Sequence, residues 1–129
     1  MVGELGSGKS TQIPQFILYD ELPHVTSSQI ACTEPRCVAT KSISRRVAEE
    51  MDVKLGEEVG YATLFEDNNG PKTLLKYMTD RVLLREAMTD PLLGHYTCIM
   101  LDKADERTIS TDILMGLLKN VTHTFKYIG

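Results

Sequence analysis

Residues 3–10 are Gly-Glu-Leu-Gly-Ser-Gly-Lys-Ser, which fits the phosphate-binding loop pattern G-x-x-x-x-G-K-[ST] at every fixed position. Gly6 and Gly8 allow the backbone to bend so that successive N–H groups form a concave nest at a helix N-terminus. Lys9 is long enough to reach the β- and γ-phosphates, and the Ser10 hydroxyl suits Mg²⁺. The alternative is a glycine-rich turn before an ordinary helix, but such a match arises by chance in on the order of a few chains per thousand of this size. The loop therefore predicts a site for a nucleoside triphosphate with Mg²⁺.

The overall composition fits one domain and narrows the function only slightly. The chain has 129 residues, of which 42% are hydrophobic, enough to form a single core. A formal net charge of −4 argues against a polybasic nucleic-acid coat, although it leaves room for a local basic groove. The three cysteines, Cys32, Cys37 and Cys98, lack C-x-x-C spacing, so we expect neither a disulfide framework nor a zinc site. This cysteine usage fits a reduced, intracellular compartment. No apolar run approaches the roughly 18 residues of a membrane span, so we expect no membrane partner.

Strand-like and helix-like segments alternate along the chain, which is typical of a parallel sheet covered by helices. We expect strands at 29–33, 58–65, 73–79, 97–101 and 125–128, and helices at 9–20, 36–51, 80–88 and 108–121. In the second helix, Val38, Ile43, Val47 and Met51 recur at helical spacing and are expected to form its apolar face. A turn at 68–71, Asn-Asn-Gly-Pro, separates the second and third strands. The run 97–101 ends at Asp102, as when a buried central strand delivers a carboxylate to the carboxyl edge of a sheet.

The two ends of the chain suggest a truncated domain. A phosphate loop normally follows a central strand, yet only Met1 and Val2 precede it here. A central position left empty would expose unpaired backbone groups on the neighbouring strands. We therefore expect an α/β domain of the phosphate-loop class that is truncated at both ends and is a fragment of a larger protein.

Several further stretches, taken with the phosphate loop, resemble one family. They are TQIPQ (11–15), ACTEPR (31–36), EEMDVKLGEEVGY (49–61), LKYMTD (75–80), LDKADERT (101–108) and TDILMGLL (111–118). The chain resembles the first RecA-like lobe of a DEAH-box ATP-dependent RNA helicase of the fungal splicing and ribosome-biogenesis type. The resemblance covers almost the whole chain and implies that residues 1–129 are a partial helicase ATP-binding domain, a RecA-like parallel sheet flanked by helices. It also implies a hydrolase that binds ATP or another nucleoside triphosphate, takes part in mRNA processing and is located in the nucleus.

The resemblance assigns roles where the residues match. The residues implied to surround the phosphates are Gly3, Glu4, Leu5, Gly6, Ser7, Gly8, Lys9, Ser10 and Thr11. Ser10 and Asp102 are the implied Mg²⁺ ligands, with Asp102 acting through water. The implied contacts to the RNA sugar-phosphate backbone are Thr33, Pro35, Arg36, Thr79 and Asp80. Contacts to the backbone position a strand without reading its sequence, which suits a translocating helicase.

The chain departs from the family at the catalytic carboxylate. Residues 102–105 are Asp-Lys-Ala-Asp where the family has Asp-Glu-Ala-His. Lys103 stands in place of the glutamate that polarises the attacking water, and it brings a cation toward Mg²⁺. Loss of a positioned general base lowers the rate by roughly 10² to 10⁴. Asp105 replaces the histidine that couples nucleotide state to the rest of the machine. We therefore assign no catalytic residue and expect hydrolysis to be badly impaired.

The RNA side departs as well. Cys37 and Leu64 stand where the family usually has arginines, and Glu34 adds an anion in place of glutamine. Arg81 replaces a glycine and returns one positive charge. Because fewer phosphates are neutralised, we expect the RNA affinity to be weaker and less salt-dependent than that of the family.

Three functions remain open on the sequence alone. The favoured one is the ATP-binding lobe of a DEAH-box RNA helicase. Its expected partners are RNA, protein activators, and the second helicase lobe with its arginine fingers, which we expect to be missing from this sequence. The second is a degenerate, non-catalytic module that binds nucleotide, RNA or a helicase partner. The third is an unrelated phosphate-loop enzyme, but the Asn-Lys-x-Asp string of a GTPase and the arginine-bearing lid of a small kinase are both missing from the sequence.

Overall fold

The computed structural model describes residues 12, 14, 15, 29–90, 96–102, 112, 113, 116 and 124–128. The phosphate loop and residues 103–105 lie outside this set. Of the expected first helix, Gln12, Pro14 and Gln15 are described and are helical. Of the expected helix 108–121, Asp112, Ile113 and Gly116 are described and are also helical.

The described strands form one six-stranded sheet in the order β3-β2-β4-β1-β5-β6. The strands are β1 (Gln29–Glu34), β2 (Val59–Ala62), β3 (Asp67–Asn68), β4 (Leu75–Thr79), β5 (Tyr96–Asp102) and β6 (Thr124–Ile128). All neighbouring pairs are parallel except β2 with β3, which is antiparallel. Each strand is hydrogen-bonded to the next, so no empty position interrupts the sheet between β3 and β6. The expectation of an α/β fold built on a mainly parallel sheet is confirmed.

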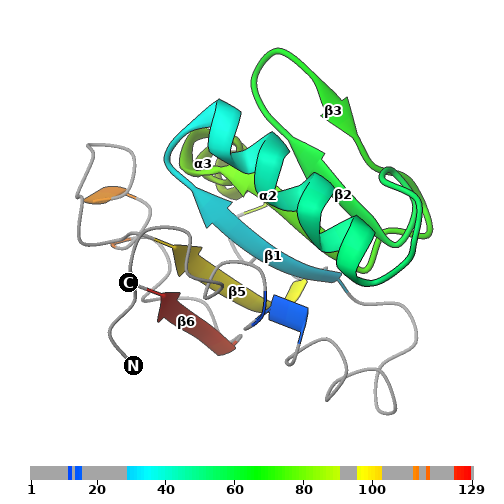
Figure 1. The fold of residues 1–129 in the computed structure, drawn as a ribbon. Helices are drawn as coiled ribbons and strands as arrows, with labels where there is room; N and C mark the ends of the chain where they lie inside the picture. The colour runs from blue at the N-terminus through cyan, green and yellow to red at the C-terminus, as the bar shows by residue number, and fades with distance from the viewer. Residues whose placement is uncertain are drawn as a thin grey trace.

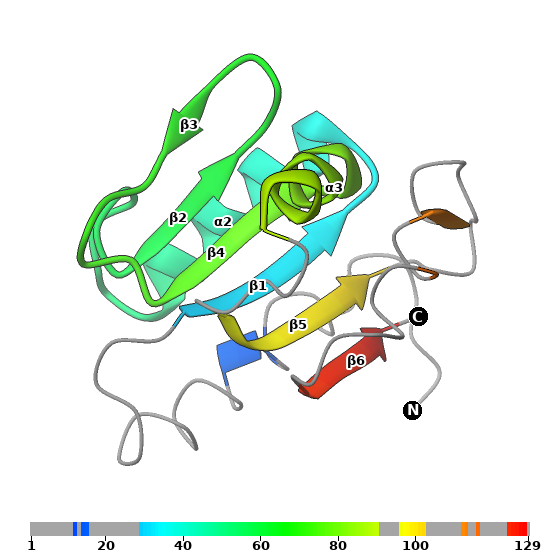
Figure 2. The same cartoon turned by 180° about the vertical axis from the view of Figure 1, so that it is seen from behind.

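Two described helices cover opposite faces of this sheet, α2 (Cys37–Glu50) and α3 (Asp80–Thr89). Figure 1 shows α2 in front of the strands, and Figure 2, from behind, shows α3 on the other side. The side chains of β1 alternate accordingly: Ile30 and Cys32 pack in the cluster of Val47 from α2, and Ala31 packs in the cluster of Leu83 from α3. Because both faces are covered, the central strands are nearly continuously apolar rather than alternating.

The buried stripe of α2 differs from the expected apolar face. Val47 is fully buried as expected, but the stripe is completed by two small polar residues, Thr40 and Ser44, whose hydroxyls donate to the carbonyls of Arg36 and Lys41 at 2.8 Å. Val38 is 80% exposed, so its expected place on the apolar face is wrong. It lies two residues before Thr40, about 200° around the helix, and therefore points away from the sheet.

The expected strand 58–65 is also shorter in the structure, because the chain turns after Ala62. Residues 67–68 then fold back along β2 as the short antiparallel strand β3. Gly60 permits this close return, since a Cβ there would lie 2.6 Å from the Asn69 Cβ and 2.7 Å from the Asn68 carbonyl oxygen. The chain therefore makes an extra edge strand where the sequence predicts only a turn.

A partly buried polar network links α3 to two strands. Between Gln29 and Ile30 the pairing with β5 shifts from Tyr96 to Cys98, and this bulge places Tyr96 in the cluster of Leu83 on the α3 side. The Tyr96 hydroxyl donates to Glu86 Oε1 at 2.6 Å, and Lys76 Nζ lies 3.2 Å from Glu86 Oε2. Burial, and then the hydrogen bond and negative charge of Glu86, raise the pKa of Tyr96 well above its usual range. The hydroxyl therefore remains a neutral donor that holds α3 against the sheet.

The network predicts a stability loss on Tyr96→Phe. The variant keeps the packed ring but removes the donor to Glu86, so we expect the free energy of unfolding in urea to fall by about 1 to 2 kcal/mol. The matched control is Tyr61→Phe, because Tyr61 is also buried yet its hydroxyl makes no hydrogen bond within the described part of the chain. Equal losses in the two variants would show that the network does not stabilise α3.

Candidate functional site

The carboxyl ends of three adjacent strands bring the predicted RNA-contacting residues and Asp102 to one edge of the sheet. β1 ends at Glu34 and is followed by Pro35 and Arg36, while β4 ends at Thr79 and continues directly into α3. Glu34 is the register partner of Thr79. On the other side of β1, β5 runs parallel and ends at Asp102. In open parallel sheets, ligands bind at this carboxyl edge.

The five predicted RNA contacts differ in how far they reach solvent. Arg36 is exposed and Pro35 is half-buried. Thr33, Thr79 and Asp80 are buried, at 0%, 3% and 3% exposure. Among these five residues, exposed atoms for a ligand therefore come mainly from Pro35 and Arg36.

The buried members also have structural roles. Thr79 is the N-cap of α3, and its hydroxyl accepts the Val82 N–H at 3.4 Å. Asp80 is the acidic residue of the first turn of α3, where a negative charge interacts favourably with the helix dipole. The Thr33 hydroxyl is buried and has no hydrogen-bond partner within the described residues. Capping and helix-start chemistry thus account for part of the motif that the sequence assigns to RNA.

A pocket of about 280 Å³ opens at this edge between the starts of α2 and α3. It brings together predicted RNA contacts and positions where the sequence differs from the helicase family that it resembles. Its lining residues are Pro35, Cys37, Leu64, Phe65, Thr79, Asp80 and Arg81. The structure therefore places Cys37 and Leu64, which were expected to weaken RNA binding, and Arg81, which was expected to return one charge, beside the predicted contacts.

Phe65 is the residue that the sequence reasoning missed. It was expected only as the end of a strand, yet it lies in the loop after β2 with 89% of its surface exposed. The signal in the sequence is an aromatic residue next to Glu66 and Asp67, where a buried strand would instead continue with apolar residues.

The start of α2 favours an anion more than the start of α3. α2 has no acidic residue in its first turn, and its N-cap residue, Arg36, makes no side-chain cap hydrogen bond. α3 carries both the Thr79 cap and Asp80. Because the first N–H groups of a helix and its dipole attract anions, a phosphate is better accommodated beside Arg36 and Cys37 than beside Asp80.

The predicted nucleotide site is described only at its margins. Asp102 is the last residue of β5, and its backbone pairs with Ile128 of β6. Gln15 donates to Glu50 Oε1 at 3.0 Å and so links the first helical residues to the end of α2. Within the described ranges no group of three or more His, Cys, Asp or Glu residues could hold a metal ion. The implied ligand Ser10 and the side chain of Asp102 lie outside those ranges.

Two further findings bear on what this edge serves. No helix in the described part of the chain combines the length and apolar character needed to cross a bilayer. A comparison of the chain with models of known protein families found no match.

Proposed function

We propose that this chain is the ATP-binding, RNA-contacting lobe of a DEAH-box ATP-dependent RNA helicase, with impaired hydrolysis. The observation that carries the proposal is the meeting of Arg36, Thr79 and Asp102 at the carboxyl ends of β1, β4 and β5. The resemblance assigns Arg36 and Thr79 to RNA and Asp102 to Mg²⁺, although these residues are far apart along the chain. The parallel register of three neighbouring strands supports that assignment.

The RNA part of the proposal rests on the surface around Arg36. An exposed guanidinium beside a helix start without acidic residues suits a single phosphate of an extended strand. Such contacts neutralise charge and read no bases, so they give weak, salt-dependent and sequence-independent binding. The negative net charge of the chain and the replacements at Cys37 and Leu64 agree with weak binding.

The nucleotide part rests on the phosphate loop and on the residue after Asp102. Gly8, Lys9 and Ser10 supply the groups that hold phosphates and Mg²⁺. Lys103 follows Asp102 directly, where the family has its general base. A lysine there cannot accept a proton from water while it is charged, so bound ATP would persist rather than turn over. The same replacement favours the second candidate, a non-catalytic module that binds nucleotide, RNA or a helicase partner.

The RNA contact is tested with Arg36→Ala. We expect this variant to bind a fluorescein-labelled single-stranded RNA roughly three- to tenfold more weakly and to lower the slope of log affinity against log salt by about 1, because one phosphate contact is lost. Fluorescence anisotropy across a salt series measures both quantities. The control is Arg46→Ala on α2, an exposed arginine that pairs with Glu50 at 3.1 Å. Equal effects of the two substitutions would contradict a site at the sheet edge.

Impaired hydrolysis is tested at Lys9 and Lys103. Lys9→Ala should abolish binding of a fluorescent ATP analogue, and the native chain should release no more phosphate from ATP than this variant, with or without RNA.

The double change Lys103→Glu and Asp105→His should tighten Mg²⁺-ATP binding without restoring unwinding. RNA-stimulated phosphate release by the native chain would contradict the impaired site.

A further inference from the structure

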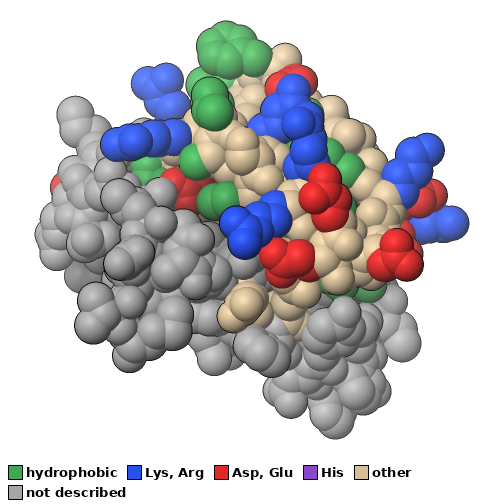
Figure 3. Space-filling view, viewed as in Figure 1, with side chains coloured by type: hydrophobic (Ala, Val, Ile, Leu, Met, Phe, Trp, Pro, Cys, Tyr) green, Lys and Arg blue, Asp and Glu red, His purple; other side chains and the backbone are tan. Residues whose placement is uncertain are grey.

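Two strongly exposed apolar side chains line a groove beside α2, next to the pocket at the carboxyl edge of the sheet. Five large apolar side chains are exposed among the described residues: Val38, Leu64, Phe65, Met88 and Ile113. Val38 and Phe65 are the most exposed, at 80% and 89%, and both line a groove of about 520 Å³ between α2 and the loop at 63–66. Figure 3 shows hydrophobic side chains at the upper end of this face with Lys and Arg side chains beside them. Covering two such side chains would remove substantial apolar surface from water.

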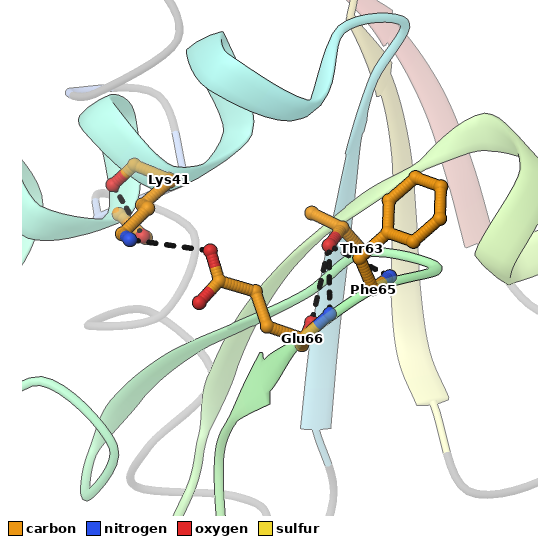
Figure 4. Close-up of polar contacts among 5 residues, drawn as sticks. Lys41, Thr63, Phe65 and Glu66 are labelled. Atoms are coloured by element: carbon orange, nitrogen blue, oxygen red, sulfur yellow. Dashed lines mark hydrogen bonds and ion pairs between the residues drawn. The ribbon is translucent and has the colours of Figure 1, made fainter.

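The loop holds Phe65 outward through hydrogen bonds of its own. The Thr63 hydroxyl accepts the N–H groups of Phe65 and Glu66 at 3.3 and 3.2 Å, and the Thr63 N–H donates to the Glu66 carbonyl at 2.8 Å. Figure 4 shows the Phe65 ring directed away from these bonds. Because the turn is already formed, a partner that covers Phe65 need not order the loop.

The charges of the groove favour carboxylates. Lys41 and Arg45 lie one helical turn apart on α2 and both line the groove. Lys41 pairs with Glu66 at 3.2 Å, an exposed pair that a competing carboxylate can exchange at little cost. Arg45 makes no ion pair within the described part of the chain, and neither does Arg81 in the adjoining pocket, which shares Phe65 and Cys37 with the groove. Lys41, Arg45 and Arg81 thus line the two pockets around Phe65, against two carboxylates, Glu66 and Asp80.

The lining favours a polypeptide over a nucleic acid. Val38 is aliphatic and offers no flat face on which a base could stack, whereas it packs readily against an apolar side chain. The Glu66 carboxylate also lies in the groove, so the groove suits a ligand whose separate carboxylates can avoid Glu66 better than a continuous line of phosphates. A peptide with alternating carboxylates and one large apolar side chain matches both the cations and the apolar floor.

We propose that this groove docks an acidic segment of a partner protein, which places a large apolar side chain against Phe65 and Val38 and carboxylates beside Arg45 and Lys41. The site uses neither Arg36 nor the phosphate loop. It therefore goes beyond the proposed helicase function and gives this lobe a surface for a protein partner next to the carboxyl edge of β1, β4 and β5, with which it shares Cys37 and Phe65.

The proposal is tested by selecting phage that display random peptides for binding to the native chain. We expect enrichment of peptides that combine Asp or Glu with Leu, Ile, Phe or Trp. A labelled copy of an enriched peptide should bind Phe65→Ala at least about tenfold more weakly. Arg45→Ala should weaken binding about threefold and reduce its salt dependence.

Two matched controls separate the groove from general stickiness. Met88→Ala removes another exposed apolar side chain on α3, and Arg46→Ala removes the arginine next to Arg45; both should leave peptide binding unchanged. Phe65 is almost fully exposed, so Phe65→Ala is expected to retain the native melting temperature. No enrichment, enrichment without acidic residues, or binding that survives Phe65→Ala would overturn the proposal. If single-stranded RNA displaces the peptide, and if its binding is lost in Phe65→Ala and Arg45→Ala, the groove binds nucleic acid and the proposal is overturned.

Discussion

The parallel pairing of β1 with β4 on one side and β5 on the other is the constraint on which the rest of the structure depends. It sets Glu34 opposite Thr79 and brings the end of β5 to the same edge. Both helices that follow these strands, α2 and α3, therefore start at this edge and cover opposite faces of the sheet. The burial of β1 on both faces secures the register, because a slip by one residue would exchange the side chains that face the two helices. The placement of Arg36, Thr79 and Asp102 follows from this pairing.

Much of the fold could be predicted because local pattern and tertiary burial agree in the central strands. The apolar runs at 29–33 and 97–101 are strands in the structure, and the helix expected at 80–88 is α3 with one further residue. The sequence was less informative where burial depends on small polar residues. Thr40 and Ser44 face the sheet by bonding to their own helix, so periodicity in apolar residues misplaced Val38. The bulge that turns Tyr96 toward α3 has no local signature, since it depends on the partner strand.

The candidate site was predictable in its location but not in its exposure. The motif residues meet at one edge as a parallel sheet requires, yet Thr33, Thr79 and Asp80 are buried there. Whether a threonine hydroxyl caps a helix or faces a ligand depends on the backbone around it, which the motif alone does not specify. Phe65 shows the reverse case, because its exposure results from the turn built by Thr63. Cys37 and Phe65 line both the pocket at the proposed RNA-contacting edge and the groove beside α2, so the two proposed surfaces are neighbours with different chemistry.

The central claim is that the carboxyl edge of β1, β4 and β5 is the ligand-binding edge, and backbone NMR tests it most directly. The ¹⁵N-labelled chain would be titrated with a single-stranded RNA oligomer while its amide resonances are followed. The account predicts that the largest shifts occur at Arg36, Cys37 and Arg81, at the starts of α2 and α3. Shifts confined to the opposite edge, at Gln29, Leu75 and Tyr96, or no shifts at saturating RNA, would contradict it.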